Sequence, residues 1–279
     1  MIKFTKMHGI GNDYIYFDCT EHEFPEPEKL AVKLSDRHKG VGGDGIILIL
    51  KSDVADFRMR MFNADGSEGK MCGNGTRCIA KYVFDRGLTD KKEFTLETLA
   101  GIKKIKVFTE NGKVKTVSVD MGAPVLDAKD VPVISDVSPV INAPFETENG
   151  VFNVTAVSMG NPHGVIFTKT PVKEIDVEKL GRPLENHPSF PDRANIEFIN
   201  VLSKTELDMR VWERGSGETL ACGTGACAAV VAACENGFCD KTTEVCVHLL
   251  GGDLYITYSD TVIMRGPAEF VFDGELTEE

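Results

Sequence analysis

The sequence predicts an α+β fold of two pseudo-symmetric domains, each a curved, mostly antiparallel, barrel-like β-sheet around a central helix. The prediction rests on an internal repeat, because the stretch 63–78 recurs about 150 residues later in the stretch 213–225. In each copy a cysteine is followed by Gly-x-Gly and an apolar run, and Gly87 or Gly237 stands where a helix C-cap belongs. The second run has no polar face, which is typical of a helix buried on every side.

Further matches in the same order extend the repeat along most of the chain. Residues 57–62 and 207–212 correspond without a gap, and both show the alternation expected of half-buried strands. The other matched segments are 7–17 with 159–167, 44–50 with 195–201, and 93–101 with 244–251. Each domain is therefore expected to contain the same strands in the same order.

A hairpin follows these strands in each copy. In the first copy, residues 103–108 and 114–119 flank Asn111-Gly112, a dipeptide that favours a tight turn between antiparallel strands. The counterpart in the second copy is 253–257 and 261–264, with a turn near 259–260.

These matches predict an N-terminal repeat domain, residues 1–124, and a C-terminal repeat domain, residues 151–267. The stretch 125–150 is rich in proline and polar residues, which suits an extended connection between them. The last segment, 268–279, has a strand-like pattern and is expected to return to pair with the first domain.

Length and charge narrow the functional class. The chain has 279 residues and a formal net charge of −12, which argues against nucleic acid or an anionic membrane as its main partner. The N-terminus is too short and too charged for a secretory signal, and no apolar run approaches the roughly 20 residues of a membrane span. We therefore expect a cytoplasmic enzyme or binding protein for a small molecule, with a homodimer as its candidate assembly.

The eight cysteines are too sparse for a disulfide scaffold, so free thiols in a reducing compartment are expected. Their spacings differ from those of structural zinc sites and the six histidines are scattered, so no metal is expected. Cys72 and Cys222 occupy equivalent positions in the two copies of the repeat, and each is followed by Gly-x-Gly. A cysteine that only filled the core would not need these flanking glycines. The others are interpreted as small core residues: Cys19, Cys78, Cys227, Cys234, Cys239 and Cys246.

A thiol at a helix N-terminus lies beside unpaired N–H groups and about half a positive charge. We therefore expect the pKa values of Cys72 and Cys222 to fall from about 8.5 toward neutrality. The N–H groups of Gly73-Asn74 and Gly223-Thr224 can hold a ligand carboxylate. If the domains face each other about a pseudo-twofold axis, one thiol removes a proton from a carbon and the other protonates its opposite face. This reaction needs no metal, flavin or pyridoxal phosphate.

Taken together, these residues resemble the diaminopimelate epimerase family of cofactor-independent amino-acid racemases over essentially the whole chain. The resemblance is carried by Gly9–Asp13, Asn63–Glu68, Met71–Gly75, Gly160–His163, Arg193–Asn195, Glu213–Thr219 and Ala221–Gly225. It implies interconversion of LL- and meso-2,6-diaminopimelate, which supplies precursors of lysine and, in many bacteria, of cell-wall crosslinks. It implies no cofactor.

The resemblance also implies a role for each matching position. Cys72 and Cys222 are the acid/base residues, and Glu213, with His163, tunes these thiols and meets an ammonium group of the substrate. The reacting carboxylate is held by Gly73, Asn74, Gly223 and Thr224. The substrate is further gripped by Asn12, Asn63, Asn161, Asn195 and Arg214. Some members have glutamine where this chain has Gly45, so no substrate contact is assigned there.

Simpler roles stay open for several of these side chains. Asn12 and Asn161 also suit turns, and Asn195 suits a strand edge. Glu213-Arg214 also suits a surface pair that contributes little to stability. Asp44 and Asp65 are interpreted as turn residues.

Two other functions also stay open, a proline or hydroxyproline racemase and a non-catalytic amino-acid binding protein. The charges of Glu213-Arg214 argue against the first, because a proline ring has no second charged end. Substitution of Cys72 or Cys222 distinguishes an epimerase from a non-catalytic binding protein, because ligand binding can survive that change while epimerisation cannot.

Overall fold

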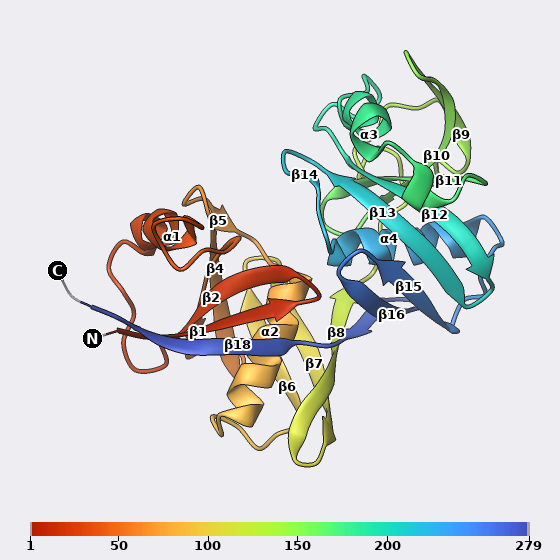
Figure 1. The fold of residues 1–279 in the computed structure, drawn as a ribbon. Helices are drawn as coiled ribbons and strands as arrows, with labels where there is room; N and C mark the ends of the chain where they lie inside the picture. The colour runs from red at the N-terminus through yellow and green to blue at the C-terminus, as the bar shows by residue number, and fades with distance from the viewer. Residues whose placement is uncertain (1, 278–279) are drawn as a thin grey trace. The chain divides into compact units, whose positions relative to one another are not determined.

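The computed structural model describes residues 2–277, and the chain separates into two compact units. One unit comprises the chain up to Asp120 together with the segment from Arg265 onward, and the other comprises Met121–Met264. Each unit has its own strands and its own central helix (Figure 1).

The sheet of the first unit is mixed but mostly antiparallel. Its strands are β1 (Ile2–Gly9), β2 (Asn12–Asp18), β3 (Gly45–Leu50), β4 (Phe57–Asn63), β5 (Glu68–Gly69), β6 (Glu93–Thr98), β7 (Gly101–Glu110), β8 (Lys113–Gly122) and β18 (Glu269–Leu276). β1 pairs antiparallel with both β18 and β2, and β2 runs parallel to β3. β4 pairs antiparallel with β3 and parallel with β6, and β7 lies antiparallel between β6 and β8.

The second unit repeats this pairing. Its strands are β9 (Ala143–Thr147), β10 (Gly150–Ser158), β11 (Pro162–Phe167), β12 (Asn195–Ser203), β13 (Glu206–Glu213), β14 (Gly217–Glu218), β15 (Glu244–Leu249), β16 (Gly252–Tyr258) and β17 (Val262–Gly266). β11 runs parallel to β12, β13 pairs antiparallel with β12 and parallel with β15, and β15 pairs antiparallel with β16. The same order of parallel and antiparallel pairs joins β2, β3, β4, β6 and β7, so the predicted α+β fold with two repeats is confirmed.

The central helices are α2 (Gly73–Asp85) and α4 (Gly223–Glu235). α4 contacts β10, β11, β12, β15 and β16 of its own unit, and every residue from Ala226 to Ala233 is fully buried. α2 contacts β1, β2 and β7 of the first unit. A helix with strands on several sides has no face toward water, which explains the apolar run without a polar stripe.

Turn and cap residues have the conformations that the sequence predicts. Asn111 and Gly112, between β7 and β8, have φ values of 51° and 77°, as a tight hairpin turn requires. Gly87 and Gly237 have φ values of 78° and 76° just after α2 and α4, where a residue with a side chain would be strained. Among the described helices, none is long and apolar enough to cross a membrane.

Three short helices were not predicted: α1 (Pro27–Ser35), η1 (Val172–Glu174) and α3 (Val177–Glu185). α1 lies between β2 and β3, and α3 lies between β11 and β12. Both of these strand pairs are parallel, so the chain must cross from one end of the sheet to the other between them. The helices form part of these two equivalent crossovers.

Candidate functional site

Cys72 and Cys222 occupy the same position in the two units, as the N-cap residues of α2 and α4. Each has an extended backbone, and each sulfur accepts a hydrogen bond from the backbone N–H three residues later. The distances are 3.3 Å to Gly75 N and 3.3 Å to Gly225 N. The predicted location of both thiols at helix starts is therefore confirmed, and each sulfur replaces the usual oxygen acceptor of an N-cap.

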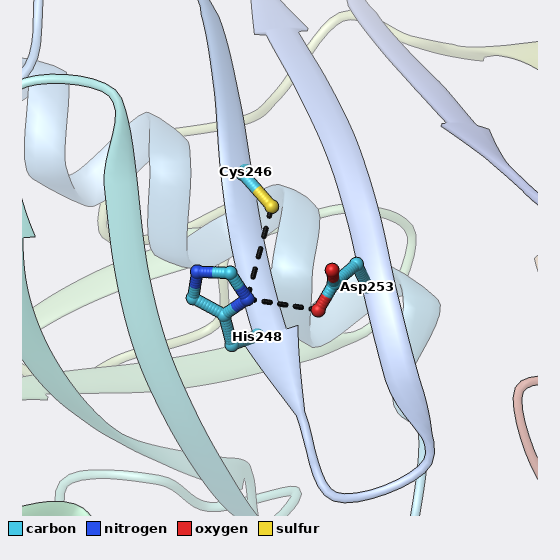
Figure 2. Close-up of side chains that lie close together, drawn as sticks. All are labelled: Cys246, His248 and Asp253. Carbon is cyan, nitrogen blue, oxygen red and sulfur yellow. Dashed lines mark hydrogen bonds and ion pairs between the residues drawn. The ribbon is translucent and has the colours of Figure 1, made fainter.

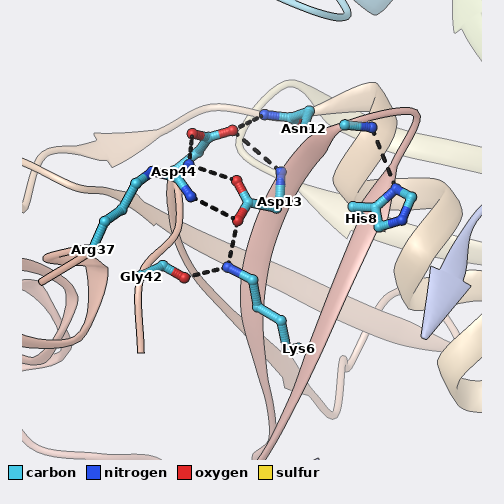
Figure 3. Close-up of polar contacts among 8 residues, drawn as sticks. Lys6, His8, Asn12, Asp13, Arg37, Gly42 and Asp44 are labelled. Atoms are coloured by element: carbon cyan, nitrogen blue, oxygen red, sulfur yellow. Dashed lines mark hydrogen bonds and ion pairs between the residues drawn. The ribbon is translucent and has the colours of Figure 1, made fainter. Parts of the chain in front are cut away.

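The Asn12 side chain connects Cys72 to an acidic residue. The Cys72 thiol donates to Asn12 Oδ1 at 3.3 Å, and Asn12 Nδ2 donates to Asp44 Oδ2 at 2.7 Å. Figure 3 shows Asp44 beside Asn12, with the backbone N–H of Asp13 donating to the same carboxylate oxygen at 3.2 Å. Asp44 thus fixes which end of the Asn12 amide faces the thiol, a role that its interpretation as a turn residue missed.

Asp13 anchors the other side of this cluster. Its carboxylate accepts two hydrogen bonds from Arg37, at 2.8 and 3.2 Å, and lies 2.5 Å from Lys6 Nζ (Figure 3). Burial by itself raises the pKa of the Asp13 carboxyl, but the bonds from Arg37 and Lys6 outweigh it and hold this pKa below its ordinary value. Since Arg37 also donates to Asp44 at 3.0 Å, one cation ties both acidic residues together.

Asn63 and Asn74 lie in the segments before and after Cys72. Asn63 ends β4, and its Nδ2 donates to Ser67 Oγ at 3.0 Å across a turn. Asp65 accepts from the backbone N–H and the hydroxyl of Ser67 at 2.9 and 2.6 Å, as a turn residue does. Gly73 and Asn74 are buried in the first turn of α2.

No side chain can project from position 45 in this backbone. A Cβ atom on Gly45 would lie 2.0 Å from the carbonyl oxygen of Phe62. A residue with a side chain at this position would therefore require the surrounding backbone to shift.

Cys222 lies among carboxylates as well as at a helix start. Burial raises the pKa of its thiol well above the ordinary value, and the charges of Glu213 and Glu197 add to this effect. The hydrogen bonds from Thr224 and Gly225 act in the opposite direction but do not compensate. The expectation of a lowered pKa is therefore wrong for Cys222, because loss of solvent and two nearby anions outweigh the helix terminus.

Glu213 is one of the two acidic residues whose charges act on Cys222. Its carboxylate accepts a hydrogen bond from the Thr219 hydroxyl. Burial raises the pKa of Glu213 above its ordinary value, and hydrogen bonds from Thr219 and Cys222 offset only part of this increase. The second carboxylate is Glu197, a residue for which the sequence predicts only a strand position.

Glu197 lies on β12 and is completely buried together with His163 of β11. His163 Nδ1 lies 2.7 Å from Glu197 Oε1, and His163 Nε2 lies 3.1 Å from Asn161 Oδ1. Within residues 2–277, Glu197 Oε2 has no hydrogen-bond partner. A Cβ atom at Gly225 would lie 2.7 Å from Glu197 Oε1, so this glycine leaves room for the carboxylate beside the start of α4.

Asn195 holds the turn that carries Arg214. Its Oδ1 accepts from the backbone N–H of Arg214 at 2.9 Å, and its Nδ2 donates to the carbonyl oxygen of Pro162 at 3.1 Å. The Arg214 guanidinium is exposed and donates to the carbonyl oxygen of Asp192 at 2.8 Å. Asn195 therefore links β12 to the residues before His163 and after Glu213, a larger role than that of a strand-edge residue.

The structure thus groups the predicted site residues within each unit. In the first unit Asn12 contacts Cys72, Gly73 and Asn74 follow Cys72 at the start of α2, and Asn63 lies at the end of β4. In the second unit the group comprises Asn161, His163, Asn195, Glu213, Arg214, Cys222, Gly223 and Thr224. Each group combines a sulfur, backbone N–H groups of a helix start and amide side chains. These groups suit acid/base chemistry on a ligand with a carboxylate.

A family model described as diaminopimelate epimerase matches residues 4–126 and 155–271. The chain is 52% identical over 278 residues to a diaminopimelate epimerase of Acetivibrio thermocellus, covering 99% of this chain and 98% of the relative. It is 50% identical over 278 residues to a diaminopimelate epimerase of Methanococcus maripaludis strain S2, covering 99% of both.

The fold also occurs in a more distant solved structure. A phenazine biosynthesis protein of the PhzF family from Bacillus anthracis superposes with a TM-score of 0.72 and 21% sequence identity, covering 99% of each chain. At this identity the likeness concerns the fold alone.

Proposed function

The chain belongs to the diaminopimelate epimerase family, and we propose that it performs the family reaction with Cys72 and Cys222 as the two acid/base residues. The reaction is the epimerisation of LL-2,6-diaminopimelate to the meso form. The observation that carries the proposal is the equivalent placement of two sulfurs, each the N-cap of its unit's central helix. A two-base inversion needs one proton acceptor and one proton donor of this kind.

The proton balance of the proposed reaction is simple. The thiolate of one cysteine takes the proton from Cα, and the electron pair of the broken C–H bond moves into the adjacent carboxylate. The thiol of the other cysteine then gives its proton to the opposite face of Cα. Backbone N–H groups of Gly73-Asn74 and Gly223-Thr224 stabilise the negative charge on the carboxylate while it develops.

We assign Cys222 the donor role in the resting enzyme. Burial, Glu213 and Glu197 raise the pKa of this thiol, so it carries its proton at neutral pH. When Cys222 becomes a thiolate, the substrate ammonium group beside Glu213 offsets the neighbouring negative charge. We also expect His163 to tune this thiol, and Glu197, whose Oε1 lies 2.7 Å from His163 Nδ1, is the positioning residue that orients it.

The second amino-acid end of the substrate needs charged and amide partners of its own. Arg214 suits a carboxylate because its planar guanidinium offers two parallel donors, and its exposed position leaves it accessible. Asn12 provides an amide group beside Cys72, Asn63 provides one at the end of β4, and Asn161 and Asn195 provide them near His163. In this proposal all four asparagines contact the substrate, and Asn12, Asn161 and Asn195 also hold Cys72, His163 and Arg214.

The proposal is tested with Cys72→Ala and Cys222→Ala, compared with Cys234→Ala on the same helix as Cys222. Each of the first two should lose about 10²- to 10⁴-fold in kcat/KM for LL-diaminopimelate, the usual contribution of an acid/base group. In deuterium oxide, the wild type should place solvent deuterium at Cα of the product, while Cys234→Ala should behave like the wild type. Substantial turnover by either active-site variant would refute the two-base assignment.

The setting in which this activity operates is also inferred. A biosynthetic epimerase with eight free cysteines suits the reducing cytoplasm. We further infer a homodimer, which light scattering on the purified protein measures directly. A molar mass near 30.5 kDa, that of one chain, would contradict this assembly.

A further inference from the structure

A group of three metal-ligating side chains lies on the β15–β16 hairpin, outside the site described above. Cys246 and His248 are two residues apart on β15, and Asp253 of β16 is the cross-strand partner of His248. Side chains two residues apart on a strand share one face, and directly paired residues share it too. The alternate residues Val245 and Val247 are fully buried, so the three polar side chains occupy the outer face.

The three donor atoms lie close together (Figure 2). Cys246 Sγ is 3.8 Å from His248 Nδ1, and His248 Nδ1 is 2.8 Å from Asp253 Oδ1. All three donor atoms lie within 4.8 Å of one another. We propose that this hairpin face binds a thiophilic divalent cation, Zn²⁺ in the first place, through Cys246 Sγ, His248 Nδ1 and Asp253 Oδ1.

The donor set suits zinc by type and by size. A sulfur, an imidazole nitrogen and a carboxylate oxygen are the three protein donors that zinc uses, at about 2.3 Å for sulfur and about 2.0 Å for nitrogen and oxygen. Around a tetrahedral ion these lengths separate the donors by roughly 3.3–3.6 Å. The observed separations of 3.8 and 2.8 Å lie on either side of that range, and the third pair, Cys246 and Asp253, lies within 4.8 Å, so binding requires the ends of these side chains to adjust.

The surrounding charge also favours a cation. On the neighbouring strand β13, Glu206 is paired with Cys246 and Asp208 is paired with His248. Glu206 is exposed and Asp208 is partly exposed, while Leu207 between them is fully buried, so both carboxylates lie on the outer face. Together with Asp253 they give the hairpin face a negative potential that attracts a cation.

The spacing rules applied to the sequence did not predict this site. Zinc-site spacings in a sequence are recognised by close cysteine pairs. Here Cys246 and His248 are two residues apart on one strand, and Asp253 is the residue paired with His248 on the next strand. The prediction that Cys246 is a core residue is also wrong, since Cys246 is only partly buried and lies on the outer face. The site is independent of the proposed function, because none of its residues takes part in the proposed proton transfer.

The test is a zinc titration of the reduced, metal-free protein against a chromogenic chelator, repeated for Cys246→Ser, His248→Gln and Asp253→Asn. The wild type should bind one zinc ion that each variant binds at least about tenfold more weakly, since even indirect partners of a metal contribute that much. Cobalt added to the wild type should produce a thiolate-to-metal absorption band that Cys246→Ser lacks.

Matched controls separate this site from the other thiols of the chain. Cys234→Ser and His187→Gln change the same residue types elsewhere in the second unit and should keep the zinc ion. Zinc held by Cys72 or Cys222 would be unaffected by all three hairpin substitutions, so such a result would overturn the proposal. Epimerase activity without zinc should be the same in the three variants as in the wild type, which shows that they remain folded.

Discussion

The imidazole of His163 and the carboxylate of Glu197 form a fully buried pair, with Nδ1 and Oε1 2.7 Å apart. A buried carboxylate is costly unless it is paired, and Glu197 has this one partner while its second oxygen has none within residues 2–277. Its charge raises the pKa of Cys222, together with burial and Glu213. Glu197 therefore binds His163 directly and also affects the pKa of the Cys222 thiol through its charge.

We expect Glu197→Gln to lower the pKa of Cys222. Removing a nearby negative charge favours the thiolate, so the pH at which Cys222 becomes reactive should move downward. The measurement is the rate of alkylation of Cys222 against pH, followed by peptide mapping. Glu185→Gln is the matched control, because Glu185 is also buried in the second unit but binds Trp212 and Gly215. An unchanged alkylation profile in Glu197→Gln would remove Glu197 from the site.

The sequence predicted the features of the fold that local patterns determine. Apolar runs and alternation specified α2, α4 and the paired strands, because these signals depend on a few neighbouring residues. Glu197 could not be found in this way, because it alternates with Ile196 and Phe198 and so looks like an outward-facing strand residue. Only the folded unit shows that β12 is buried on both faces from Asn195 to Ile199.

The pKa of Cys222 illustrates the same limit for the site. A helix start is visible in the sequence, and it favours a thiolate. The desolvation of the sulfur and the approach of Glu213 and Glu197 depend on tertiary packing, and they decide the direction of the shift. The short helices α1 and α3 do carry local signals, Pro27 at the start of α1 and the N-cap Asp176 of α3, but helices of nine residues depend on packing against the sheet.

Asp44→Ala should reduce kcat/KM by about tenfold and should also lower the stability of the fold, because Asp44 accepts hydrogen bonds from Asn12, Asp13 and Arg37. Asp44 accepts the hydrogen bond from Asn12 Nδ2, and a hydrogen bond to a charged group contributes about 1.5–3 kcal/mol. Without it the Asn12 amide can rotate and no longer presents Oδ1 to Cys72. Asp65→Ala, a turn residue that binds Ser67, is the control and should retain more activity. Steady-state kinetics with LL-diaminopimelate decide between the two, and equal losses would argue against a specific role for Asp44.

Asp13→Asn should remove a part of the stability that disappears in acid. The folded-state pKa of Asp13 lies below its ordinary value of 3.8, so its contribution is present above that value and is lost as the pH falls through the folded-state pKa. At pH 7 the variant should be less stable by about 1–3 kcal/mol, because Lys6 loses a buried partner. Urea denaturation between pH 7 and pH 3 should show the two proteins converging at low pH. Asp53→Asn, at an exposed position, should remain parallel to the wild type, and a constant difference for Asp13→Asn would contradict the assignment.

Gly75 and Gly225 are equivalent positions, yet we expect alanine to have different effects at them. A Cβ at Gly75 would lie 2.6 Å from Ile47 Cδ1, the end of an apolar side chain that can move. A Cβ at Gly225 would lie 2.7 Å from Glu197 Oε1 and 3.1 Å from Cys222 Sγ, and His163 holds that carboxylate in place. Overpacking costs about 1–3 kcal/mol, while alanine in a helix recovers roughly 1 kcal/mol relative to glycine.

Gly75→Ala should therefore keep near-wild-type stability and much of its activity. Gly225→Ala should lose both, and its pH profile for Cys222 alkylation should shift because Glu197 is displaced. Equal stability and equal kcat/KM in the two variants would show that Glu197 does not restrict the start of α4.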